Sequence, residues 1–599
     1  MSSSSPGLFD GGKATPKPAS PAGRLALLRC REVVADRMAI TRRPRMLTPR
    51  TALLELVALA EAWRPPAPPA PSRRKTTAAP LDPLRIMVAE VAAETIRVLH
   101  KDPILKHAES PVPEMLDDIL ARWSAPVAAP EEGQERGASV TTERHPSDLP
   151  RLRAAADLLS RTYLDDASLA LGQLARDGGR RMFLLSAVCV AILSELRTRG
   201  WSDPGLRAWL AQFEAHDVIP QLQALTAKRP RALKCFIPVS GWDPSLSLGS
   251  LSVASLGTRK VPDGFPEGPY VSLTVQAFDE ASAARDAFRQ ARRVLDSVAL
   301  VRPELTASWA TPSVGVESGA FIMSFDVGAW RGSVEPLDAS VAQIMDHPAL
   351  GAACRYRVQA MQVRDPLTRL SLLWLGLERL TALPSGDVAS ATLHDLLPRT
   401  LALHKVRTEI EGLARAIERH PIPAEARIRL GADAGEEGEE SAGVDLDRVA
   451  LLRFLQRASA EEAHRWSQLF PLDVHVAQWV ERTRWHMTGP DPDRLGRFFE
   501  ATRQRIAWQV LRLQRAHERV RVDAWPASWI DDLSLHAHNY LTVALLAVMN
   551  DPEHLRAPSS VLARRAGQYD TLLTLLEKSH PRALSAEALM APLGLVGAE

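Results

Sequence analysis

The stretch of sequence with the clearest potential for chemistry runs from Gly496 to Trp525, GRFFEATRQRIAWQVLRLQRAHERVRVDAW. At 100° per residue, a helix here carries apolar residues and His517 on one face. The opposite face gathers four arginines: Arg505, Arg512, Arg515 and Arg519. Clustered cations attract the phosphates of nucleic acids. The spacing therefore predicts a phosphate-binding strip that could bind RNA, and the alternative is a structural helix with a solvated arginine face.

Most familiar catalytic patterns are absent from the sequence. It contains no GxxxxGK[ST] phosphate loop, no strand followed by GxGxxG, no GxSxG elbow and no HExxH pair. His536 and His538 are two positions apart on an expected helix, so they point in different directions. Asp279 and Glu280 stand between a strand and a helix, where we expect a helix cap and a first-turn charge. The sequence thus predicts neither a metal site nor a cofactor.

Charge and cysteine spacing narrow the class of protein. The 599 residues include 73 Lys or Arg and 71 Asp or Glu, a net charge of +2, which argues against a uniformly basic nucleic-acid coat. Four scattered cysteines without a CxxC pair indicate neither a disulfide framework nor a zinc knuckle. No apolar run approaches the ~18 residues of a membrane span, and no signal-peptide pattern opens the chain. We expect a cytoplasmic protein without membrane contact.

Hydrophobic periodicity predicts a mainly α, multidomain fold around the arginine strip. Residues 1–80 are rich in Pro and Ser and carry 14 Lys or Arg against five Asp or Glu, which predicts a disordered basic arm with one short helix near Thr51–Trp63. Residues 81–232 are expected to be helical, interrupted by a linker near residues 125–147. In RGWSDPGLRAWL, a helix should end at Gly200 and another should begin after a cap at Ser202 or Asp203.

The rest of the chain alternates between two patterns. Short β-branched runs and one amphipathic helix predict a small α+β module over residues 233–345. Residues 346–551 are expected to form a helical bundle containing an acidic loop at residues 431–445, and residues 552–599 a helical tail. Within the bundle we expect helices at Asp365–Leu383, Thr400–Arg419, Leu446–Ala458, Ala460–Leu469, Leu472–Trp485, Pro492–His517 and Asp531–Met549.

Three segments in this order resemble HEPN domains, particularly their ApeA-like branch. They are LSLLWLGLERLTAL (Leu370–Leu383), WQVLRLQRAHERVRVDA (Trp508–Ala524) and LSLHAHNYLTVALLAV (Leu533–Val548), which correspond to the first, motif and closing helices of the family. The resemblance covers about 200 residues, from Tyr356 to Asp551. The LLWxxLExL pattern, with Glu378, and the RLxRxxxxxxxD pattern, with Arg512 and Arg515, carry it. The central module also looks like the sheet-and-helix domain that often precedes such bundles in bacterial proteins, several of them linked to antiphage defence.

The resemblance implies an all-α bundle that often pairs with a second copy and, in many relatives, a metal-independent ribonuclease. Active members carry an Arg, a polar residue and then a His four to six positions after the Arg. The His moves a proton at the ribose while the Arg stabilises phosphate charge. Laid on the family helix without gaps, this sequence places His517 and Glu518 at the Arg and polar positions, and Val522 at the His position. Counted along the chain, Arg512 and His517 have the Arg-x4-His spacing, but the ungapped alignment does not place them at the family's Arg and His positions.

These observations leave three hypotheses about function. The first is a HEPN-like, RNA-associated effector or sensor with a degenerate nuclease site and a homo-oligomeric bundle, for which the resemblance implies a setting in bacterial antiphage defence. The second is a non-catalytic protein–protein scaffold in which the arginine face pairs with acidic segments such as Glu436–Glu440 or with a partner protein. The third is an active metal-independent ribonuclease with Arg512 and His517 as its catalytic pair and RNA held by Arg505, Arg512, Arg515 and Arg519.

Overall fold

Helices dominate the chain, as the apolar periodicity predicts, and the fold is mainly α. The computed structural model describes residues 20–34, 47–63, 83–124, 145, 147–177, 181–214, 217–240, 252–255, 269–301, 308–309, 313–317, 321–324, 347–363, 365–382, 389–418, 446–459, 461–462, 474–488, 493–520, 522, 525–549, 551, 557–578 and 584–590. The predicted linker at 125–147 lies almost wholly outside these residues, and the acidic loop at 431–445 and Glu436–Glu440 lie outside them altogether. Most of the predicted helix Ala460–Leu469 also falls outside them.

The first helical unit is built from nine described helices around one hydrophobic core. They are α1 (Pro21–Val33), α2 (Pro49–Ala62), α3 (Pro83–Lys101), α4 (Pro103–His107), α5 (Val112–Ser124), α6 (Asp148–Arg176), α7 (Met182–Thr198), α8 (Asp203–Leu210) and α9 (Val218–Thr226). Side-chain caps fix several starts: Ser20 accepts from the Gly23 amide, and Thr48 and Thr51 form a reciprocal capping box. Gly200 has a φ of 116°, and the Ser202 side chain caps α8, as the sequence predicts.

The prediction of a disordered arm with one short helix is wrong for part of its length. The expected helix near Thr51–Trp63 is present as α2, but α1 is a second helix, and both are buried in the core of the first helical unit. The reason lies in apolar residues such as Leu25, Ala26 and Cys30, which are fully buried on α1. A stretch rich in Pro and Ser can still form helices where proline occupies the first turn and apolar residues follow it.

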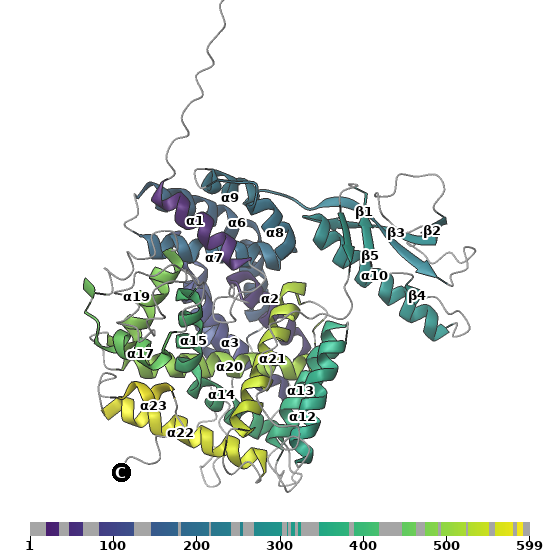
Figure 1. Ribbon diagram of the computed structural model, residues 1–599. Coiled ribbons are helices and arrows are strands. Elements are labelled where there is room, and N and C mark those ends of the chain that lie inside the picture. Colours follow the sequence, from purple (N-terminus) through teal and green to yellow (C-terminus); the bar gives the residue numbers. More distant parts are fainter. Residues whose placement is uncertain are drawn as a thin grey trace, which may run out of the picture.

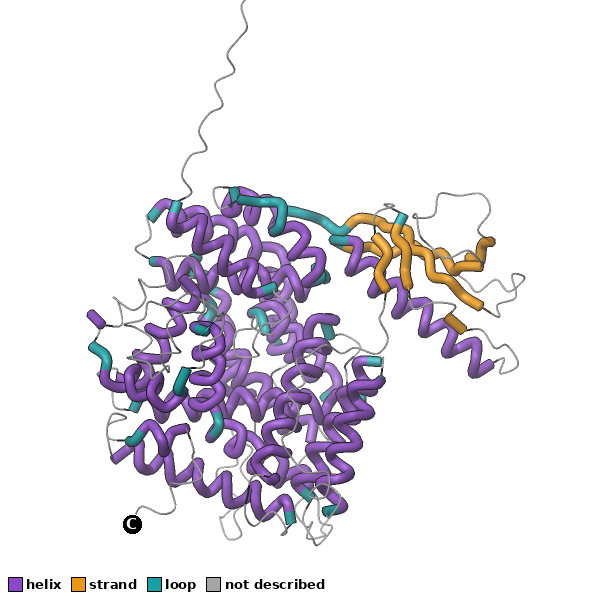
Figure 2. The backbone as a smooth tube through the Cα atoms, viewed as in Figure 1, coloured by secondary structure: helices purple, strands orange, loops and turns teal. Residues whose placement is uncertain are grey.

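A small antiparallel sheet follows in the chain. Its strands are β1 (Arg231–Ser240), β2 (Ser252–Ser255), β3 (Pro269–Ala277), β4 (Ser308–Trp309), β5 (Ser313–Val316) and β6 (Phe321–Ser324). The order is β2-β3-β1-β5-β6, with β4 paired to β1, and β1 lies antiparallel to β3 with Cys235 opposite Leu273. Helix α10 (Glu280–Val301) packs against β1, β3 and β5. The strands and α10 stand to one side of the helical body (Figure 1), and Figure 2 shows the strands gathered there.

The second helical unit has its own core. Its described helices are α12 (Pro348–Gln362), α13 (Pro366–Thr381), α14 (Ala389–Leu403), α15 (Lys405–Ile417), α17 (Arg448–Arg457), α19 (Val474–Thr488), α20 (Arg494–Glu518), α21 (Ala527–Met549), α22 (Pro558–Lys578) and α23 (Ala586–Met590). Helix α13 buries its whole predicted stripe, and the Asp365 side chain caps it. The single helix expected at Thr400–Arg419 is two helices that meet at His404.

The C-terminal helices are more than a tail. Leu562, Tyr569 and Leu572 of α22 lie in the same core as α13 and α20, and the Thr400 hydroxyl donates to the Leu562 carbonyl across α14 and α22. The bundle therefore extends beyond the boundary at residue 551 that the resemblance suggested.

Candidate functional site

The four arginines of the predicted strip do not share one solvent-facing surface. Arg505 and Arg519 are exposed, whereas Arg512 is 2 % exposed and Arg515 is 1 % exposed. The expectation of a continuous phosphate-binding face along α20 is therefore wrong in its geometry. The reason is that α2 and α3, from the first helical unit, cover the part of α20 that carries the two buried arginines.

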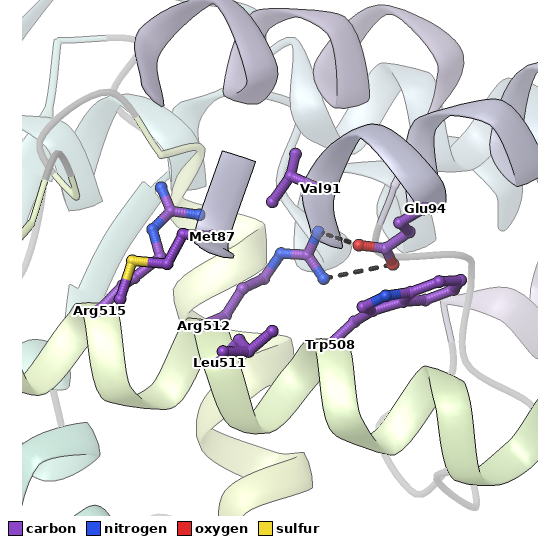
Figure 3. Close-up of a pocket in the computed structure, with 7 residues that line it drawn as sticks. All are labelled: Met87, Val91, Glu94, Trp508, Leu511, Arg512 and Arg515. Carbon is purple, nitrogen blue, oxygen red and sulfur yellow. Dashed lines mark hydrogen bonds and ion pairs between the residues drawn. The ribbon is translucent and has the colours of Figure 1, made fainter. Parts of the chain in front are cut away.

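Arg512 is held by two carboxylates of the first helical unit. Its Nε lies 3.1 Å from Oε1 of Glu55, and its Nη2 lies 2.8 Å from Oε2 of the same residue. On its other side, Nη1 lies 3.3 Å from Oε1 of Glu94, and Nη2 contacts Oε2 of that residue. Figure 3 shows the contacts to Glu94 in a narrow pocket that Met87 and Val91 of α3 help to line. With a further contact of 3.2 Å from Nε to Oε2 of Glu55, five nitrogen–oxygen contacts thus occupy the guanidinium.

Arg515 completes the cluster. Its Nη1 also pairs with Oε1 of Glu55, so this carboxylate joins both arginines. The Arg515 guanidinium lies 5.1 Å from the centroid of the Trp525 ring, and that of Arg512 lies 5.8 Å from the centroid of Trp529. Two buried cations therefore face two buried carboxylates, with aromatic rings packed against the cations.

The electrostatics of the cluster follow from burial and pairing. Burial favours the protonated form of Glu55, but Arg512 and Arg515 outweigh it and hold the pKa of Glu55 below its usual range. Burial outweighs Arg512 at Glu94 and raises the pKa of that carboxyl. For the cations, burial lowers the pKa of Arg515, whereas the two carboxylates overcome burial and raise the pKa of Arg512. Glu55 is therefore the firmly ionised centre of the cluster.

A seam of polar contacts continues along α3 and α20. The Trp508 Nε1 donates to Glu90 at 3.0 Å, and the Arg97 guanidinium lies 5.6 Å from the centroid of the Trp508 ring. Arg97 also donates to the Ala501 carbonyl at 3.3 Å. Since Glu90, Glu94 and Arg97 are spaced by four and three residues, they form one stripe on α3. The three side chains of this stripe contact Trp508, Arg512 and the backbone of α20, respectively.

The second candidate catalytic residue, His517, belongs to a different environment. Its ring is stacked on Trp374 of α13, 6.3 Å between centroids, and its Nδ1 is buried without a hydrogen-bond partner. On the neighbouring helix α14, the His394 Nε2 donates a 2.7 Å hydrogen bond to Oε1 of Gln514, and its ring also lies against Trp374. Arg512 contacts α2 and α3 while His517 contacts α13. The structure does not bring the two residues together as a catalytic pair.

Val522, which stands at the family's His position, is buried and 3 % exposed. Its apolar side chain belongs to the same core as Leu513 and Ala516 of α20. A proton-transferring group is therefore missing at the position where the resemblance places one.

A second buried ion pair joins the same two helical units. Arg197 of α7 donates to Asp532 of α21 through two bonds of 2.8 and 3.0 Å and to Asp203 of α8 at 2.7 Å. The two aspartates outweigh the effect of burial and raise the pKa of Arg197. The Ser528 hydroxyl donates to the Arg197 carbonyl at 3.4 Å. Charged side chains thus tie the two units together at two places.

The α+β module contacts the first helical unit through Asp279, the residue that caps α10. Asp279 caps α10 by accepting from the Ser282 amide at 2.8 Å, as its position at the strand-to-helix junction predicts. The same carboxylate accepts from the amide and hydroxyl of Ser202 at 2.9 and 2.7 Å, and Phe278 stacks on Trp201. Asp279 therefore links the start of α8 to the start of α10.

Within the described residues, no three His, Cys, Asp or Glu side chains are grouped as metal ligands. None of the helices in that part of the chain is long and apolar enough to cross a membrane. Comparison with family models, with curated proteins and with solved structures gives no match to this chain.

The sequence analysis missed Glu55 and Glu94 as partners of the arginines. Both are carboxylates in mainly apolar helical segments: Glu55 is the one charged residue of TALLELVALA, and Glu94 shares MVAEVAAETI with Glu90. A charge on an apolar helix face is the signal that could have marked them, because a buried carboxylate needs a cation nearby.

Proposed function

We propose that this chain is a non-catalytic, HEPN-like binding protein in which the motif helix has become the internal connection between two helical units. The observation that carries the proposal is the Arg512 guanidinium, occupied on both sides by Glu55 and Glu94. An arginine that stabilises a transition state must be free to approach the phosphate. The buried Val522 supports the same conclusion.

Two of the three hypotheses agree with this proposal because neither involves catalysis. They are the RNA-associated effector or sensor with a degenerate site, and the scaffold. The proposal sets aside the active ribonuclease. The scaffold hypothesis changes in one respect, since the acidic partners of Arg512 and Arg515 are Glu55 and Glu94 of the same chain. A bacterial antiphage setting enters the proposal through the resemblance alone.

Pairing of two copies is also part of the proposal, with a restriction on its surface. Members of the family often pair with a second copy, and their chemistry requires the Arg and the His of the motif helix at one composite site. Here α2 and α3 cover the part of α20 that carries Arg512 and Arg515. A homo-oligomer would therefore form through another surface of the bundle.

The test is incubation of the purified full chain with a mixed RNA substrate in EDTA, beside the variants His517→Ala and Arg512→Ala/His517→Ala. We expect all three proteins to cleave no more RNA than a buffer control. His517→Ala keeps the buried ion cluster intact, so it stays informative where the double variant unfolds. Cleavage by the unmodified chain that disappears in His517→Ala would overturn the proposal.

A further inference from the structure

Exposed aromatic and cationic side chains gather where α19 meets the first half of α20. Trp485 of α19 is 47 % exposed, whereas the neighbouring tryptophans Trp508, Trp525 and Trp529 are buried. The Arg494 guanidinium, at the start of α20, lies over the Trp485 ring. The buried tryptophans also have a guanidinium against the ring, so what distinguishes Trp485 is the exposure of its indole.

Helix geometry adds two arginines to this surface. Arg482 stands three residues before Trp485, which places both on the same side of α19. Arg505 stands eleven residues after Arg494, three turns along α20 and only about 20° around its axis. The side chain of Arg482 is 49 % exposed, and Arg505 is exposed. The four side chains, Arg482, Trp485, Arg494 and Arg505, are called the α19–α20 patch below.

Positive charge exceeds negative charge beside the patch. The Glu409 carboxylate of α15 pairs with Lys405, accepts from the Trp479 Nε1 at 2.9 Å and lies 3.8 Å from Arg482. Burial lowers the pKa of Lys405, Glu409 opposes this, and the nearby guanidiniums of Arg505 and Arg482 add to the lowering. Glu409 therefore faces Lys405 and Arg482, and Arg505 adds a third positive charge near Lys405. Among the described residues Arg505 has no hydrogen-bond or ion-pair partner.

The patch is the open continuation of the arginine stripe of α20. Arg494, Arg505 and Arg512 fall on nearly the same line of the helix, at intervals of eleven and seven residues. The end of this line at Arg512 and Arg515 is closed by carboxylates of α2 and α3. At the other end of this line, Arg494 and Arg505 are not paired with the carboxylates of α2 and α3, and Arg494 adjoins Trp485. Beyond the buried pair Arg512 and Arg515, α20 therefore presents exposed positive charge at this end through Arg505, as it does at its C-terminal end through Arg519.

We propose that the α19–α20 patch binds single-stranded nucleic acid, with a base stacked on Trp485 and Arg494 and phosphates held by Arg482 and Arg505. A flat exposed ring beside cations is how proteins bind single strands without reading sequence, because every base has a π-face and every nucleotide a phosphate. An acidic peptide would use the cations but leave the indole without a planar partner. This inference goes beyond the proposed lack of catalysis and does not depend on it.

The experiment measures fluorescence anisotropy of labelled 20-nucleotide oligouridine RNA and oligothymidine DNA with the full chain at low salt. The test variants are Trp485→Leu and Arg482→Gln/Arg505→Gln. The controls replace another exposed aromatic residue, Phe183, which is 64 % exposed, and two exposed arginines of the first helical unit, as Phe183→Leu and Arg151→Gln/Arg181→Gln. Because all these side chains lie at the surface, thermal unfolding of each variant should match that of the unmodified chain.

We expect Trp485→Leu and the Arg482/Arg505 variant each to weaken binding at least tenfold, and the controls to bind as the unmodified chain does. Loss of two phosphate contacts should also reduce the slope of log affinity against log salt by about 1.4, at about 0.7 per contact on a single strand. Binding to the RNA oligonucleotide alone, or to both the RNA and the DNA oligonucleotide, supports the proposal and identifies the class of ligand.

Three results would overturn it: no binding by the unmodified chain at low salt, equal loss in test and control variants, or displacement of the RNA by polyglutamate at equal charge concentration. The first of these leaves the cleavage experiment unaffected. Failure of the patch is therefore distinguishable from failure of the proposed function.

Discussion

Arg512 and Glu55 lie 457 positions apart in the chain and meet through three hydrogen bonds, of 3.1, 3.2 and 2.8 Å, between buried side chains. The guanidinium and carboxylate face each other as two planar forks, which is the strongest geometry for such a pair. Glu55 also holds Arg515. One carboxylate on α2 thus pairs with two cations on α20 and contributes to the attachment of the first helical unit.

The first prediction concerns Glu55→Gln, which keeps the size of the side chain and removes its charge. We expect the free energy of unfolding to fall by about 3–5 kcal/mol, because two buried arginines would then share Glu94 alone. Urea unfolding followed by circular dichroism at pH 7 measures this. Arg505→Ala, on the same helix but exposed, should change stability by no more than about 0.5 kcal/mol. Equal effects of the two substitutions would show that the buried cluster does not hold the units together.

The second prediction concerns Gly205, in the first turn of α8. A Cβ added there would lie 2.4 Å from the Asp279 Cγ, too close for any real contact. Gly205→Ala should therefore displace Asp279 from Ser202 and loosen the α+β module from the first helical unit. Limited proteolysis should cut between α9 and β1 faster than in the unmodified chain.

Gly567 supplies the matched control for this substitution. It lies within α22, and a Cβ there meets nothing within 4 Å. Gly567→Ala should raise stability by roughly 0.5–1 kcal/mol, since alanine favours the helix over glycine. Faster proteolysis in Gly567→Ala, or none in Gly205→Ala, would contradict the role given to Asp279.

Local features of the fold were predictable from the sequence because they depend on neighbouring residues. The Asp365 cap, the buried stripe of α13, the break at Gly200 and the Asp279 cap each follow from residue types within one or two turns. The strands of the central module follow from their β-branched runs in the same way.

The burial of Arg512 and Arg515 was not predictable in this way. Helical periodicity places the arginines opposite the apolar face, and an unpaired arginine face is normally solvated. What reverses the expectation is a contact between residues more than 400 positions apart, and periodicity carries no information about such pairs. Glu55 could have been singled out as a buried charge, but the sequence could not name its partner.

The last prediction is a pH dependence that His404 produces. Burial lowers the pKa of His404 to about 4, Arg565 and Arg407 add to the effect, and its buried Nε2 has no hydrogen-bond partner. Above the ordinary pKa of about 6.5 the ring is neutral in both the folded and unfolded chain, so it does not affect the pH dependence. Between about pH 6.5 and pH 4 the unfolded chain binds a proton at this histidine that the folded chain does not bind, so stability falls as pH falls.

The contribution of His404 to this loss of stability is about 1.4 kcal/mol per pH unit at most. In urea unfolding at pH 7, 6 and 5, His404→Gln should therefore lose less stability on acidification than the unmodified chain, whereas His145→Gln, at an exposed position, should follow it. Identical slopes for His404→Gln and the unmodified chain would mean that His404 is free to protonate in the folded protein.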